Sequence, residues 1–73
     1  MKSSYFVKAS WDAEASVWIS ETDIPGLVIE ADTLAEFEGL LAALAPEMLA
    51  ANENVGSQGV SVAFSAQRAF AFA

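Results

Sequence analysis

The segment from Asp23 to Leu41, DIPGLVIEADTLAEFEGLL, restricts the fold more than any other part of the sequence. Pro25 fixes φ at the second position of a turn, and Gly26 accepts the positive φ that a type II turn needs at the third. After a few apolar residues, Thr33 and Glu36 form a T-x-x-E capping box that marks the start of a helix. We therefore expect a turn, a short strand and a sheet-to-helix corner here.

The helix after this corner has an apolar face and one interruption. Its apolar residues recur at helical spacing and should lie on a sheet: Leu34, Phe37, Leu40, Leu41 and Leu44. Pro46 lacks an amide donor and clashes with the carbonyl four residues earlier, so we expect a kink or break there, with a last helical piece ending near Asn52. Gly39 either approaches a strand closely or is merely tolerated.

Three stretches before the helix have the alternation of strands. Residues 4–11 and 15–21 alternate with period two and are joined by a short polar segment, which predicts an antiparallel hairpin. Residues 27–31 predict a third strand. Trp11 and Trp18 flank the hairpin, and core or interface packing is favoured for them over stacking on a nucleobase or sugar.

The run VSVAFSAQRAFAFA, residues 60–73, alternates to its last residue. It follows a loop predicted at 52–59 and has no Pro and one charge, so an uncovered strand of this kind would promote aggregation. We expect a homodimer or higher oligomer in which the strand from Val60 to Phe72 pairs across or packs against a second copy. The residues assigned to self-association are Val62, Phe64, Phe70 and Phe72. The alternative is that the last residues form a frayed tail.

The order β-β-β-α-β predicts one α+β domain over residues 1–73, with two layers and one main helix on one face of an antiparallel sheet. A chain of 73 residues buries a small core, and it has no Cys for disulfides. Oligomerisation is therefore the expected source of additional stability.

The residue types argue against an enzyme. There is no Cys and no His, so the usual nucleophile–base pairs are missing and no cofactor is expected. Carboxylates could still hold a magnesium cluster, which keeps a carboxylate-metal hydrolase as an alternative. The candidates are Asp12, Glu14, Asp23, Glu30 and Asp32, but their spacing matches no calcium loop, and solvated surface charge is the favoured interpretation.

The net charge of −7 limits the partners. Nucleic-acid binding needs clustered Lys and Arg, which this sequence lacks, so direct contact with nucleic acid is not expected. Acidity favours a basic partner, although it could serve only solubility. We see no apolar stretch long enough to span a membrane and no signal peptide, and for a bacterial type of chain we expect a cytoplasmic location.

Most of the sequence resembles the short branch of HicB-like antitoxins. The resemblance lies in Trp11-Asp12 and Val17-Trp18, in the stretch IPGLVIEADTLAE, and in the Leu-rich helix that closes with Pro46-Glu47 and Asn52. It implies a partly ribonuclease-H-like domain without nuclease chemistry. Full-length members carry a DNA-binding segment that these residues do not include, so we do not carry over DNA binding or autoregulation.

The resemblance also implies a function. HicB-like proteins neutralise a small basic RNA-cleaving toxin of the double-stranded-RNA-binding-domain type by covering its RNA-binding or active surface. For this role we expect partner-facing acidic residues around the hairpin: Asp12, Glu14, Glu21 and Asp23. An orphan oligomer that binds a ligand or serves a structural role without any toxin is the alternative.

Overall fold

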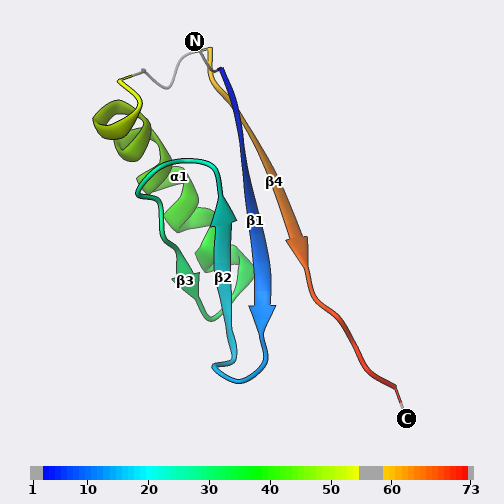
Figure 1. The fold of residues 1–73 in the computed structure, drawn as a ribbon. Helices are drawn as coiled ribbons and strands as arrows, with labels where there is room; N and C mark the ends of the chain where they lie inside the picture. Colours follow the sequence, from blue (N-terminus) through cyan, green and yellow to red (C-terminus); the bar gives the residue numbers. More distant parts are fainter. Residues whose placement is uncertain (1–2, 55–58, 73) are drawn as a thin grey trace.

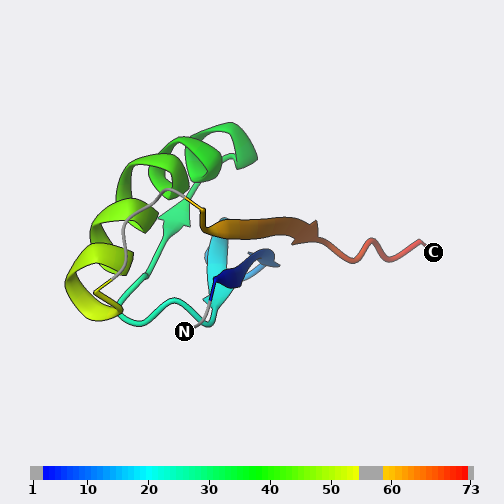
Figure 2. The same ribbon diagram turned by 90° about the horizontal axis from the view of Figure 1, so that it is seen from above.

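The computed structural model describes residues 3–54 and 59–72. Its elements follow the order β1 (Ser4–Asp12), β2 (Val17–Thr22), β3 (Glu30–Ala31), α1 (Leu34–Asn52) and β4 (Ser61–Gln67). The strands form one sheet with the order β3-β2-β1-β4, and α1 covers one of its faces (Figures 1 and 2). The predicted two-layer β-β-β-α-β domain is confirmed.

The pairing of the strands differs from the prediction at one point. β1 and β2 form the expected antiparallel hairpin, and β3 pairs antiparallel with β2. β4, however, pairs parallel with β1, from Ser4 opposite Ser61 to Ser10 opposite Gln67. The sheet is therefore mixed, and the prediction of an antiparallel sheet was wrong for this strand. The reason is topological: β3 runs parallel to β1, and the α1 crossover returns the chain to the end of the sheet where both begin.

The helix begins as predicted and passes through its proline. The Thr33 hydroxyl accepts a hydrogen bond from the Glu36 amide at 3.1 Å, and α1 continues without a break to Asn52 with Pro46 inside it. A break was one of the two outcomes predicted at Pro46, a kink being the other, and the continuous helix contradicts the break. Ala45 and Leu49 are buried in the core around this position, so tertiary packing stabilises the continuous helix against the local cost of the proline.

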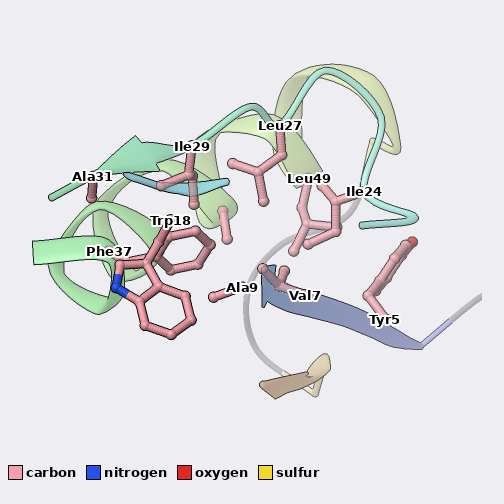
Figure 3. Packing of buried hydrophobic residues seen from close by; sticks show 11 residues of the cluster. Tyr5, Val7, Ala9, Trp18, Ile24, Leu27, Ile29, Ala31, Phe37 and Leu49 are labelled. Atoms are coloured by element: carbon pink, nitrogen blue, oxygen red, sulfur yellow. The ribbon is translucent and has the colours of Figure 1, made fainter. Parts of the chain in front are cut away.

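The core lies between α1 and the strands (Figure 3). Alternate residues of β1 supply one wall, and the segment before β3 and the helix supply the others. The buried cluster consists of Tyr5, Val7, Ala9, Trp18, Ile24, Leu27, Ile29, Ala31, Phe37, Ala45 and Leu49. The rings of Trp11 and Trp18 meet edge to face with centroids 5.3 Å apart. Their predicted packing role is thus confirmed for Trp18, which is buried.

The predicted turn also anchors the helix. The Leu27 amide donates to the Ile24 carbonyl at 3.3 Å, and Gly26 has a φ of +80°, as a type II turn requires. At the far end of α1, the Asn52 side-chain amide donates to the Pro25 carbonyl at 2.9 Å. The loop predicted at 52–59 falls partly outside the described residues, because 55–58 are not among them.

Candidate protein-binding surface

One face of the sheet is not covered by α1, and we call it the open face. Cross-strand neighbours in a sheet share a face. Lys8 lies opposite Glu21 and Ser10 opposite Ile19, while Ile19 also lies opposite Glu30. Their neighbours along the strands point into the core, so these side chains point away from α1. The open face comprises Phe6, Lys8, Ser10, Ile19, Glu21, Val28 and Glu30.

Three large apolar side chains are exposed on this face. Phe6 is 47% exposed, Ile19 37% and Val28 81%. Val28 precedes β3 between the buried Leu27 and Ile29, and this segment stays beside β2 because the Ser20 amide donates to the Ile29 carbonyl at 3.1 Å. These side chains share one face with polar residues among them, which makes the open face a candidate interaction surface.

The charge of the open face is negative. The Glu21 carboxylate accepts a hydrogen bond from the Ser10 hydroxyl at 2.9 Å and lies 3.5 Å from the Lys8 ammonium. The Ser10 hydrogen bond, followed by the charge of Lys8, holds the pKa of Glu21 below its ordinary value. Lys8 is thereby paired, and the exposed Glu30 adds a further negative charge. A ligand for this face would combine apolar contact with basic groups.

The four acidic residues assigned to partner binding do not form one cluster. The Asp12 carboxylate accepts from the amides of Glu14 and Ala15 at 3.1 and 3.3 Å and so shapes the hairpin turn. The Asp23 carboxylate accepts from the Phe6 amide at 2.9 Å. Phe6 and Asp12 are separated by about 20 Å along β1 at the usual rise of a strand. Asp12 and Asp23 therefore have structural roles at opposite ends of the hairpin, and Glu21 lies between them on the open face.

The carboxylates considered for a metal site are also dispersed. Among the described residues, no group of three or more Asp or Glu side chains is placed to hold a metal ion. In the same part of the chain, no helix is both long and apolar enough to cross a membrane.

The residues assigned to self-association fall in two places. Val62 and Phe64 lie on the α1 side of β4, where the Phe64 ring is 5.8 Å from the Phe37 ring. Phe70 and Phe72 follow the strand and are 67% and 91% exposed. Between α1 and β4 there is an open apolar groove of about 260 Å³. It is lined by Leu41, Ala42, Ala45, Pro46, Leu49, Val60 and Val62.

Sequence reasoning missed the apolar part of the open face. Alternation along the first strand already placed Phe6 on the other face from Tyr5 and Val7. No pattern in the sequence showed which of the two faces the helix would cover. Ile19 is β-branched and Val28 lies in an apolar run, features that buried residues share, so neither residue carries a local signal of exposure. In the structure, Trp18 pairs with Trp11 and Ile19 pairs with Ser10. Because neighbouring residues of a strand point to opposite faces, Ile19 points to the open face when Trp18 points to α1.

Comparison with known proteins identifies a family. The sequence profile of DUF1902, described as a domain of unknown function, matches residues 4–73. The chain belongs to the DUF1902 family. This DUF1902 chain is also similar to a solved structure, the hypothetical protein TTHA1013 from the extremely thermophilic bacterium Thermus thermophilus. The two are 40% identical with a TM-score of 0.78, over 94% of this chain and 99% of the other. No curated protein matches the chain.

Proposed function

We propose that this DUF1902 chain is a protein-binding module of the antitoxin type. It neutralises a small basic RNA-cleaving toxin by covering the toxin's RNA-binding or active surface. The observation that carries the proposal is the open face, where Phe6, Ile19 and Val28 are exposed beside the carboxylates of Glu21 and Glu30.

The physical chemistry of the face suits such a partner. A toxin that binds RNA presents Lys and Arg, and an acidic surface competes with RNA phosphates for these groups. The net charge of −7 accelerates the encounter with a basic protein. The exposed apolar side chains then supply contact area that RNA cannot offer. The resemblance to HicB-like antitoxins supports the same assignment.

The test is co-expression with a small basic ribonuclease of the double-stranded-RNA-binding-domain type encoded beside the gene. We expect a complex on size exclusion and rescue of growth from the toxin. The association rate should fall as ionic strength rises, because the steering charges are exposed and screened. A genomic neighbourhood without such a protein, or a coexpressed pair that elutes separately, would refute the proposal.

Two charge reversals locate the binding surface. Glu30→Lys changes the open face, whereas Glu47→Lys makes the same change of net charge at an exposed position of α1. The net charge is therefore the same in the two variants. If the open face binds the toxin, Glu30→Lys should weaken affinity about tenfold or more beyond Glu47→Lys, because it opposes a basic patch at contact distance. Equal affinities of the two variants for the toxin would show that the open face is not the toxin-binding surface.

A further inference from the structure

The strand β4 lies at an edge of the sheet and lacks two kinds of residue that protect an edge against pairing with another chain. β4 pairs with β1 on one side only. Natural edge strands are guarded by Lys, Pro, bulges or covering loops, but Ser61–Gln67 contains neither a charged residue nor a proline. All ten acidic residues of the chain lie at or before Glu53, and Arg68 is the one charge in 60–73. A second β4 can therefore approach this edge without opposing carboxylates.

The unpaired backbone groups of the edge can be assigned. The Ser61 amide donates to the Ser3 carbonyl at 3.0 Å and so points toward β1. In a parallel pair, alternate residues direct their amide and carbonyl to the same side. The amides of Val62, Phe64 and Ala66 therefore point away from β1 toward the free edge.

The same chain offers apolar groups that match its own groove but cannot reach it. Phe70 and Phe72 are exposed, and the segment that carries them continues away from the body beyond β4 (Figures 1 and 2). The groove opens near the start of the strand, at Val60 and Val62. Phe70 follows Val62 by eight positions, or roughly 26 Å of extended chain. The two phenylalanines can enter such a groove only on a second molecule.

We propose that two copies of this chain form a dimer by antiparallel pairing of their β4 edges about a twofold axis at Ala66. This register places Phe70 of each copy opposite Val62 of the other, and Phe72 opposite Val60. Directly opposed residues share a face, so both phenylalanines lie on the α1 side and fill the partner's groove. The small side chain of Ala66 meets its own image at the axis.

The area is sufficient for a stable dimer. A phenylalanine side chain can bury about 150–250 Å². At the observed exposures, Phe70 and Phe72 of two copies, together with the groove surfaces that they cover, remove on the order of 1,200 Å² from water. This reaches the range of specific interfaces. The dimer does not depend on the proposed toxin, since the open face remains uncovered by the β4 pairing.

The first test is the oligomeric state by sedimentation. We expect the unmodified chain to be a dimer at roughly 100 µM, a concentration at which even weak specific dimers assemble. Phe70→Ser/Phe72→Ser should raise the dimer Kd about 100-fold, because it removes the apolar anchors that fill the partner's groove. Val28→Ser removes an apolar side chain of intermediate exposure, 81% against 67% and 91%, from the open face and should leave the Kd unchanged. A monomeric unmodified chain, or equal Kd values for all three proteins, would overturn the proposal.

A second variant tests the edge itself. Ala66→Pro removes an amide that points to the free edge and leaves the hydrogen bonds to β1 in place. It should abolish the dimer while the circular dichroism of the fold persists. A folded Ala66→Pro variant that still forms the dimer would exclude pairing through this edge.

Cysteine cross-linking tests the register, because the native chain has no Cys. In the proposed dimer, Ala66→Cys places two thiols on residues about 5.5 Å apart at their Cα atoms, within disulfide reach. Ala69→Cys separates its two copies by roughly 20 Å and serves as the matched control. Oxidation should cross-link Ala66→Cys and not Ala69→Cys. The reverse result would overturn the register.

Discussion

At the scale of single residues, Gly26 combines two requirements of the fold. Its φ of +80° is a conformation that residues with a Cβ adopt at a cost. A Cβ at this position would also lie 2.6 Å from the side-chain nitrogen of Asn52, the atom that donates to the Pro25 carbonyl. Backbone conformation and the attachment of the helix end therefore both demand glycine.

Gly26→Ala should lower the free energy of unfolding by about 1–3 kcal/mol, from the strained φ and the displaced Asn52 amide. Gly39→Ala is the matched control. A Cβ at Gly39 meets nothing within 4 Å, so this change should raise the free energy by about 0.5–1 kcal/mol through helix propensity. Urea denaturation of the three proteins at one concentration measures both effects. Equal stability of Gly26→Ala and the unmodified chain would contradict this account.

Tyr5 gives the fold a dependence on alkaline pH. Its hydroxyl donates to the Glu53 carboxylate at 3.0 Å. Burial, and then this hydrogen bond, raise the pKa of Tyr5 above 10.0. The folded chain therefore favours the neutral phenol. The resulting contribution to stability is complete below pH 10.0 and is lost as the pH rises through the raised pKa of Tyr5.

The melting temperature of the unmodified chain should fall as the pH is raised from below to above the pKa of Tyr5. Tyr5→Phe cannot ionise and should show a smaller decline over the same range, although it is less stable near neutral pH because the hydrogen bond to Glu53 is missing. Parallel declines in the two proteins would assign the alkaline transition to other groups, such as the lysines.

At the scale of the elements, α1 contains a proline whose cost is offset by packing. Pro46 should leave the Ala42 carbonyl without its helical donor. Pro46→Ala restores the donor and should raise the free energy of unfolding by about 1–2 kcal/mol, after allowance for the more flexible unfolded chain. Glu47→Ala, at the next exposed position, is the control and should change stability by less. Denaturant unfolding measures the free energy of unfolding of both variants. A Pro46→Ala variant less stable than the unmodified chain would show that the proline is required in α1.

At the scale of the whole molecule, charge and apolar exposure are segregated. The acidic residues occupy the hairpin, the β3 region and the helix, whereas β4 and the segment after it carry only Arg68. The guanidinium of Arg68 lies over the Trp11 ring at 4.2 Å and over the Phe70 ring at 5.0 Å. The molecule thus has two surfaces of different character, an acidic and apolar open face and an uncharged edge.

If the uncharged edge joins two copies, stability depends on concentration. Association with a folded partner stabilises the native state by mass action, so the melting temperature should rise as the protein concentration increases. Phe70→Ser/Phe72→Ser should show a much smaller rise over the same concentrations, because its dimer is weaker. Calorimetry across a hundredfold dilution series provides the comparison, and a constant melting temperature for the unmodified chain would contradict the dimer.

Much of the fold could be predicted because local rules and tertiary packing agree. Pro25 and Gly26 form the expected turn, and Thr33 caps the helix as its spacing indicated. At Pro46 the helix continues where a break was one of the two expected outcomes, because buried neighbours on the same helix outweigh one lost hydrogen bond. For the candidate site, acidity was visible in the sequence. The hydrogen bonds that Asp12 and Asp23 accept within the hairpin and the exposure of Phe6, Ile19 and Val28 were not.

The sequence by itself determined the turn, the cap, the order of the elements and the division of charge, because each depends on residues close together in the chain. Tertiary structure alone decided that β4 lies parallel to β1, that the helix covers the face holding Trp18, and that Ile19 points outward. These outcomes depend on how distant segments exclude water from a shared core. Alternation defines two faces of a strand, and packing selects which of them is buried.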